Sequence, residues 1–254
     1  MKKAYSGNRK SLFFLGLFAM CLLFLTVSCG LDVVDAVLDD PFYLEAAPPN
    51  ETSSFDLRTF TFSTSKLDNA NEFGKGYIYY KIYNRNSIKE SEKSNLETIT
   101  ADSSRRHNAY TTLLNSYSYQ PLHYEKTLGG QLEEFSLDNK SQTVSIRLTN
   151  YGTDAYSAKI TIDNTTVGIP MRINGKTFDF GGKGDYDEKP QKVPSAEEST
   201  SDVKRFSDTP DNGNYFYVVL YGIFYMPSES FDKTFYSPVH YLGEVKIDAS
   251  TEMN

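Results

Sequence analysis

The sequence predicts a mainly β protein, an antiparallel β-sandwich with one helical insertion. The 254-residue chain has no Trp but 19 Tyr and 17 Phe, and aromatic side chains favour the half-buried faces of sheets. Apolar and polar residues alternate with period two in several segments between residues 55 and 248, as expected of strands. Helical spacing is confined to about residues 87–120. Residues 55–254 are therefore expected to form a single domain.

The first 28 residues are predicted to be a secretory signal peptide. Four basic residues within the first ten precede an apolar run from Leu12 to Val27, and the first acidic residue is Asp32. This order of a basic end and an apolar stretch is typical of export signals. A helix over the apolar run would rise only about 24 Å, less than the roughly 30 Å hydrocarbon core of a bilayer. A removed signal is therefore favoured over a permanent span.

The stretch "LTVSC", Leu25 to Cys29, resembles the bacterial lipoprotein signal. In that family a small residue, here Ser28, precedes a cysteine that is lipidated and becomes the mature N-terminus. Thr26 stands where Leu is usual, a looseness that spirochaetal lipoproteins share. The resemblance implies lipid on Cys29, and two or three chains would hold the protein on the membrane almost permanently, because each buried methylene adds about 0.8 kcal/mol. A plain signal peptide and an uncut anchor are the alternatives.

Charge and cysteine content limit the partners of the mature chain. Removal of residues 1–28 takes away four basic and no acidic residues, so the formal net charge falls from -7 to -11. A chain this acidic is not expected to bind nucleic acid. Cys21 lies in the removed segment and Cys29 carries the lipid, so no internal disulfide is expected.

Residues 29–54 are predicted to be an acidic tether between the lipid and the domain. They contain six acidic residues, no basic ones, and Pro41, Pro48 and Pro49. Like charges repel and prolines stiffen the chain, so an extended conformation is expected.

Two strands are predicted in the first part of the domain. Phe55 and Leu57, then Phe60 and Phe62, alternate with polar residues, with a shift of phase between the pairs. The segment "GYIYYKIYN", Gly76–Asn84, is the stronger strand. One of its faces is expected to carry Ile78, Tyr80 and Ile82, and the other Tyr77, Tyr79, Lys81 and Tyr83.

Three segments carry a wider resemblance: "SCGLD", "GYIYYKIYN" and the late "YSPVHYLGEV". Together they are similar to a group of Treponema-type spirochaetal lipoproteins, and "GYIYYKIYN" alone also resembles the central strand of fibronectin type III sandwiches. The first resemblance implies a lipid-anchored protein of the cell envelope, in the outer membrane, and it supplies no catalytic residues. The second implies a fibronectin type III or immunoglobulin-like sandwich.

The helical insertion is predicted at about residues 87–120. Tyr110, Leu113, Leu114 and Tyr117 share one helical face, with Asp102 or Ser103 as N-cap and Pro121 beyond the end. A weaker helical pattern covers Glu90–Ala101, and the basic segment "SSRRHN" with His107 is expected to be a solvated surface.

An antiparallel meander is predicted next. Val144, Ile146 and Leu148 alternate, as do Ile160 and Ile162, then Val167, Ile169, Met171 and Ile173. Asn174 and Gly175 follow and predict a type I′ hairpin, because both accept positive φ. The returning strand would carry Phe178 and Phe180.

A mobile acidic loop is predicted at about residues 181–214, where few residues can be buried. Tyr215–Met226 is then apolar on both faces and is predicted to be a central strand, bent at Gly222. Its expected partner is "PVHYLGEVKID", with Val239, Tyr241, Gly243 and Val245 on one face.

No residues are predicted to be catalytic or to bind a metal or cofactor. The mature chain contains His107, His123 and His240 but no HExxH spacing, GxSxG elbow or P-loop. Asp185, Asp187 and Glu188 are hard oxygen ligands, yet they lack EF-hand spacing and are expected to be solvated. A triad or carboxylate pair assembled from distant strands stays open.

The expected function is a non-enzymatic binding or interaction module, held on the membrane through lipid on Cys29, with an unidentified protein or glycan ligand. An exported hydrolase or carbohydrate-active enzyme on the same scaffold is one alternative, and a periplasm-facing structural or assembly lipoprotein is another. Whether the domain faces the cell surface or the periplasm is left open. The many tyrosines are expected mainly to pack across strands, and a carbohydrate-binding aromatic platform is the alternative.

Overall fold

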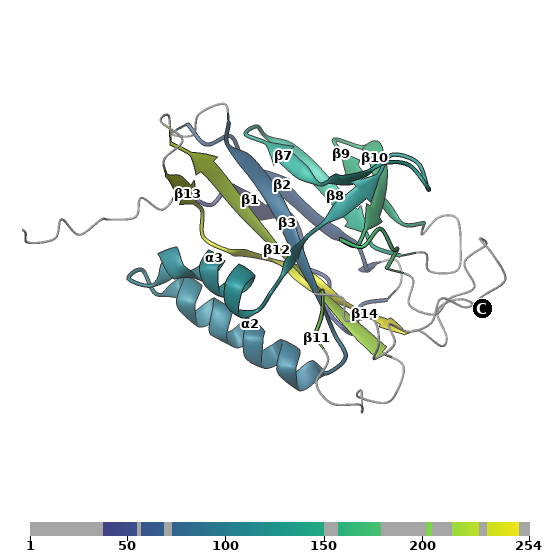
Figure 1. Ribbon diagram of the computed structural model, residues 1–254, viewed down its shortest axis with the longest axis horizontal. Helices are drawn as coiled ribbons and strands as arrows, with labels where there is room; N and C mark the ends of the chain where they lie inside the picture. Colours follow the sequence, from purple (N-terminus) through teal and green to yellow (C-terminus); the bar gives the residue numbers. More distant parts are fainter. Residues whose placement is uncertain are drawn as a thin grey trace, which may run out of the picture. The chain divides into compact units, whose positions relative to one another are not determined.

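The protein is a β-sandwich with a layer of helices on one of its sheets (Figure 1). The structure, a computed structural model, describes residues 38–54, 57–68, 73–149, 157–178, 202–204, 215–228 and 233–248. Within this part of the chain, two seven-stranded sheets pack against each other. The predicted fold class, mainly β and an antiparallel sandwich with a helical insertion, is confirmed.

The first sheet has the strand order β1-β2-β8-β9-β10-β5-β6, and every neighbouring pair is antiparallel. Its strands are β1 Phe42–Leu44, β2 Phe60–Thr64, β5 His123–Glu125, β6 Leu132–Glu134, β8 Gln142–Arg147, β9 Lys159–Ile162 and β10 Thr165–Met171.

The second sheet is built around β3 and β12, which pair antiparallel over nine residue pairs. β14 and β13 pair with β12, whereas β4, β7 and the parallel β11 pair with β3. Its strands are β3 Lys75–Tyr83, β4 Gln120–Pro121, β7 Ser136–Asp138, β11 Val203–Lys204, β12 Tyr215–Pro227, β13 Thr234–Tyr236 and β14 His240–Asp248.

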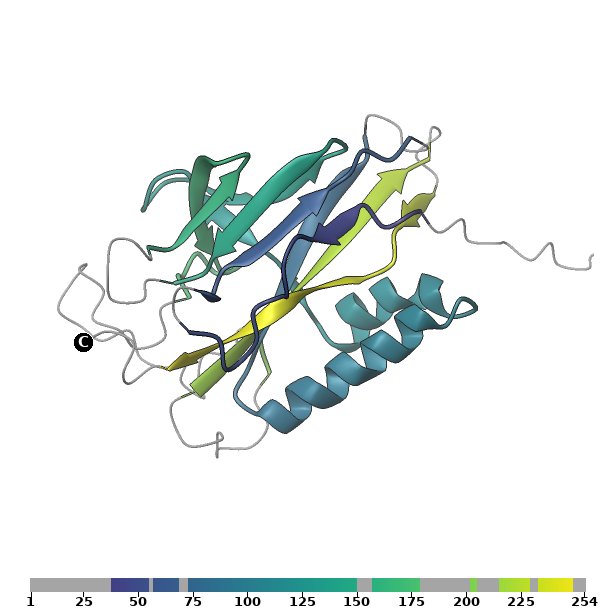
Figure 2. The same ribbon diagram turned by 180° about the vertical axis from the view of Figure 1, so that it is seen from behind.

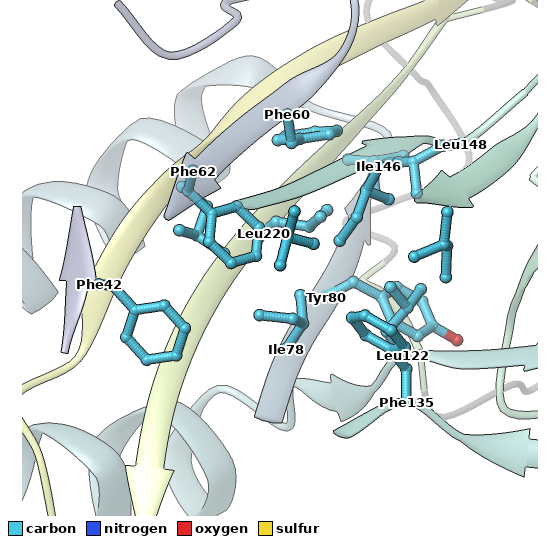
Figure 3. Packing of buried hydrophobic residues seen from close by; sticks show 14 of the residues in the cluster. Phe42, Phe60, Phe62, Ile78, Tyr80, Leu122, Phe135, Ile146, Leu148 and Leu220 are labelled. Atoms are coloured by element: carbon cyan, nitrogen blue, oxygen red, sulfur yellow. The ribbon is translucent and has the colours of Figure 1, made fainter. Parts of the chain in front are cut away.

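The main core lies between the two sheets (Figure 3). Phe60 and Phe62 of β2 and Ile146 of β8 meet Ile78 and Leu220 of the second sheet, and all five are fully buried. The alternation predicted for β3 is confirmed, because Ile78, Tyr80 and Ile82 belong to this core while Tyr79 and Tyr83 belong to a second cluster.

The second cluster lies between the second sheet and the helical insertion. Helix α2 Asn86–Ala101 is followed by a 3-10 turn, Arg106–Asn108, the short α3 Ala109–Thr111 and a π turn, Thr112–Ser116. Figures 1 and 2 show α2 and α3 on the same side of β12 and β14. Leu96 of α2 and Leu113 pack there on Tyr217 and Val219 of β12. The second sheet is therefore buried on both faces, which explains why β12 is apolar on both sides.

Helix positions differ in detail from the prediction. The longer and more regular helix is α2, which the sequence indicates only weakly. Asp102 forms the C-terminal cap of α2, and its carboxylate accepts a hydrogen bond from the Ser104 backbone N–H at 2.9 Å. It therefore caps the turn that follows, while α3 itself begins at Ala109.

The predicted turn at Asn174–Gly175 exists, but it is not type I′. Only Gly175 has a positive φ, of 73°. The two-residue turn with two positive φ angles is Asp163–Asn164, at 49° and 63°. It joins β9 to β10, with Ile162 paired to Thr165. Phe178 is buried in the core, and Phe180 lies outside the described residues.

The face predicted for the last strand is wrong. Leu242 and Val245 point into the main core, whereas Val239 and Tyr241 belong to the helical side. Gly243 has a φ of 130°, and the pairing of β14 with β12 shifts register between Leu220 and Tyr221. This bulge reverses the alternation along β14.

The prediction of an extended tether over 29–54 is wrong for its described part, residues 38–54. Leu38 and Phe42 are buried in the main core, and β1 pairs with β2. A Cβ on Gly222 would lie 2.8 Å from the Phe42 ring, so glycine there makes room for this contact. Asp40 also accepts a hydrogen bond from His240 Nδ1 at 2.6 Å. The carbonyls of Pro41 and Pro49 accept backbone hydrogen bonds from Ser65 and Glu244, at 2.8 and 2.9 Å, so both prolines belong to the folded domain.

The predicted mobile loop of 181–214 is contradicted at residues 202–204. Asp202 is fully buried and receives two hydrogen bonds from the Arg172 guanidinium, at 2.8 and 3.0 Å. The Tyr80 hydroxyl donates to the same carboxylate at 2.8 Å, and β11 pairs with β3. The rest of the segment lies outside the described residues.

Phe42→Ala should lower the free energy of unfolding by about 3–5 kcal/mol, because it empties a buried aromatic site. Urea denaturation measures the change. The adjacent Tyr43→Ala is the control, since Tyr43 is 55% exposed and should cost about 0.5 kcal/mol or less. Equal losses in the two variants would show that residues 38–54 do not belong to the folded core.

Candidate functional site

The one site residue predicted from the sequence, Cys29, lies outside the described residues, as do the signal peptide and Asp185, Asp187 and Glu188. Among the described residues, no three His, Cys, Asp or Glu side chains are grouped to hold a metal ion. No helix in the described ranges is both long and apolar enough to cross a membrane.

The described histidines are separated from one another. His107 lies in the 3-10 turn and His123 Nδ1 is 3.0 Å from the Pro121 carbonyl. His240 pairs with Asp40, and its Nε2 is buried without a hydrogen-bond partner among the described residues. The nearest serine in sequence, Ser237, is committed to backbone groups of Phe224 and Pro238. The Asp40–His240 pair therefore joins the N-terminal segment to β14.

The candidate site is a row of tyrosines on the helical side of the second sheet, here called the tyrosine surface. It consists of Tyr77 and Tyr79 of β3, Tyr225 of β12, Tyr236 of β13 and Tyr110 of α3, all partly exposed.

Four rings of the tyrosine surface, all except that of Tyr79, form a continuous row of contacts. Tyr110 and Tyr236 stack with centroids 3.7 Å apart, Tyr236 and Tyr225 lie 6.3 Å apart, and Tyr225 stacks on Tyr77 at 4.8 Å. Tyr225 and Tyr236 are direct cross-strand partners. The cross-strand packing of tyrosines predicted from the composition is therefore present. The five side chains are grouped on one part of the surface and stay partly exposed to solvent.

The hydroxyls of Tyr77 and Tyr79 stay neutral at physiological pH. Burial raises the pKa of Tyr77, and its hydrogen bond with Tyr225, at 3.0 Å, and the Glu134 carboxylate raise the pKa further. Burial and then Glu134 raise the pKa of Tyr79. Neutral phenols can both donate and accept hydrogen bonds. Combined with rigid apolar rings, this makes tyrosine suited to contact surfaces.

Two buried ion pairs hold the helical insertion beside this surface. Lys81 of β3, only 2% exposed, pairs with Glu92 of α2 at 2.7 Å. Its ammonium group also lies 5.1 to 5.6 Å from the ring centroids of Tyr83, Tyr117 and Tyr119. Burial of a charge is unfavourable unless it is paired and hydrogen-bonded, and the carboxylate and rings provide that environment.

The second pair joins Lys89 of α2 to Glu244 of β14. Lys89 is 1% exposed, and Glu51 and Glu90 lie 3.5 and 3.1 Å from its ammonium group. Lys93 and the Tyr241 hydroxyl also bind Glu244, at 3.3 and 2.9 Å. Sequence analysis missed these residues because a helical face with Lys and Glu is normally read as solvated.

Comparisons with known proteins identify no relatives, since no protein-family model, no curated protein and no solved structure matches the chain. The fold and the tyrosine surface therefore rest on the structure alone, and the finer likeness to fibronectin type III or immunoglobulin domains stays a prediction.

Glu244→Gln should weaken the dependence of stability on acid pH. Burial opposes ionisation of Glu244, but the hydrogen bonds and positive charges of Lys89, Tyr241 and Lys93 together outweigh it, so the pKa of Glu244 lies below the usual value of 4.5. A lowered pKa gives stability that is present above about pH 4.5 and is lost as the pH falls through the pKa of the folded state.

Denaturant unfolding between pH 7 and pH 3 tests this. At pH 7 the free energy of unfolding of the variant should be about 3 kcal/mol lower than that of wild type, because the buried Lys89 loses its ion pair with Glu244. This difference should shrink toward pH 3. Parallel pH curves would contradict the assigned role of Glu244.

Proposed function

We propose that this protein is a lipid-anchored lipoprotein of the bacterial cell envelope that acts as a non-enzymatic binding module. Lipid on Cys29 holds it on the outer membrane, and the tyrosine surface contacts a protein or glycan ligand. The observation that carries the binding role is the row of four partly exposed tyrosines in ring contact, drawn from four separate elements, with the partly exposed Tyr79 on the same face of β3.

Three features support this assignment over a purely structural role for the tyrosines. Buried aromatic residues would stabilise the sheet equally well without reaching solvent, yet these five do reach it. Their rigid rings lose little conformational entropy on binding. Tyrosine is also enriched among the residues that dominate binding energy. The anchoring role is supported by "LTVSC" and by the apolar run before it.

Cys29→Ser should abolish lipid attachment. Cells grown with labelled palmitate are lysed and partitioned in a detergent that separates into two phases. Wild-type protein should carry label and enter the detergent phase, while the variant should be unlabelled and enter the aqueous phase, because loss of the acyl chains removes the membrane affinity. Cys21→Ser is the matched control and should behave as wild type. Label retained on Cys29→Ser would refute the assigned lipidation site.

Replacing Tyr77 and Tyr225 together by Ser should reduce ligand binding at least tenfold, because it removes one of the two stacked pairs of the tyrosine surface. Full-length protein in detergent is applied to glycan and peptide arrays, and hits are measured for wild type and variant. Tyr43→Ser is the matched control, since Tyr43 is an exposed tyrosine of the other sheet.

Thermal unfolding confirms that the double variant is folded before its binding is compared. Unchanged array signals in a folded double variant would overturn the tyrosine surface as the binding site. Protease treatment of intact cells separately decides whether the domain faces outward or toward the periplasm.

A further inference from the structure

A cavity of about 260 Å³ lies between the C-terminal half of α2 and the second sheet. Its helical wall runs from Leu96 to Ala101, and its floor is formed by Tyr221, Val239 and Tyr241. Pockets for drug-sized ligands start at roughly 300 Å³, so this volume suits a fragment-sized molecule. None of the residues of the tyrosine surface lines it, so this cavity is a separate site.

The walls combine an apolar body with one unsatisfied polar group. Leu96 and Val239 are buried and apolar, and they would contact the hydrocarbon part of a ligand. Tyr221 is only 2% exposed, and its hydroxyl makes no hydrogen bond with any described residue. Buried polar groups in folded proteins nearly always have a partner. A ligand in the cavity would contact Tyr221, the side chain whose hydroxyl lacks a hydrogen-bond partner.

The charge of the cavity is negative. Glu97 is the one charged residue among those that line it; it is exposed, and it makes no ion pair within the described part of the chain. The nearby lysines are already committed, because Lys89 and Lys93 pair with Glu244. Burial raises the pKa of the Tyr221 hydroxyl, and the charges of Glu97 and Glu244 raise it further. Of the two carboxylates, Glu244 is compensated by Lys89 and Lys93, whereas Glu97 leaves an uncompensated negative charge at the cavity.

One ring of the floor already attracts a cation. The Lys93 ammonium group lies 4.6 Å from the centroid of Tyr241, a distance at which the electron-rich face of an aromatic ring stabilises positive charge. An aromatic wall next to a free carboxylate is the environment in which organic ammonium ions bind.

We propose that this cavity binds a small organic ammonium ion with an apolar body. The apolar body contacts Leu96 and Val239, the ammonium group pairs with Glu97, and Tyr221 provides the neutral hydrogen-bonding group. The cavity and the tyrosine surface share no residue, so each proposal can fail without the other.

Isothermal titration calorimetry on the full-length protein in detergent micelles tests the proposal with three matched probes: 2-phenylethylamine, 2-phenylethanol and 3-phenylpropionate. Titration into empty micelles is subtracted. The amine, which is protonated at pH 7, should bind at least tenfold more tightly than the alcohol, and the carboxylate should not bind detectably. Equal affinity for amine and alcohol, or no binding of the amine, would overturn the proposal.

Two variants assign the roles. Glu97→Gln should remove the preference for the amine while the alcohol still binds, and Tyr221→Phe should weaken the amine and the alcohol alike. Asp68→Asn is the matched charge control, since Asp68 is exposed and lies outside the cavity, and it should leave the preference unchanged.

Glu97 has no ion-pair partner among the described residues, so its substitution should leave thermal unfolding unchanged. A tenfold preference that persists in Glu97→Gln would refute the assigned role of the carboxylate. Binding of a lysine-rich peptide without binding of 2-phenylethylamine would replace the small-molecule ligand by a protein partner.

Discussion

The position of the helical layer depends on two buried lysine–glutamate pairs of opposite orientation. At one, the strand β3 provides the lysine and α2 the glutamate; at the other, α2 provides the lysine and β14 the glutamate. Moving α2 along the sheet would separate both pairs at once and leave four buried charges, which is strongly unfavourable. Apolar contacts alone would tolerate such sliding better. The charges thus fix where α2 and the residues after it lie on the sheet.

Much of the sandwich could be predicted, because strands with one buried face repeat every two residues, as β2 and β8 do, and because β12 is an unbroken apolar run, as expected of a strand buried on both faces. The failures have local physical causes. Helix α2 gave a weak signal because its buried face carries Lys89 and Glu92, which any hydrophobicity pattern counts as exposed. The face of β14 was wrong because the bulge at Gly243 reverses the alternation. Asp202 resembled the other acids of its loop, since its partner Arg172 is 30 residues away.

The sequence predicted the candidate site only indirectly, through its excess of tyrosine. An excess of tyrosine indicated packing across strands, and the Tyr225–Tyr236 pair shows such packing. The gathering of Tyr110 with Tyr236 and Tyr77 depends on how the insertion docks on the sheet, which no local pattern contains. Likewise the free hydroxyl of Tyr221 and the unpaired Glu97 become visible only when the side chains that surround them are known.

The burial of Leu38 and Phe42 shortens the distance that the domain can reach from its proposed anchor. Only nine residue steps separate Cys29 from Leu38, and a fully extended chain of that length spans at most about 32 Å. The predicted tether, residues 29–54, would reach nearly three times as far if all of its 26 residues were extended. With lipid on Cys29, Leu38 would stay within about 32 Å of the anchor, so the ligands of the domain would be those found at or next to the membrane.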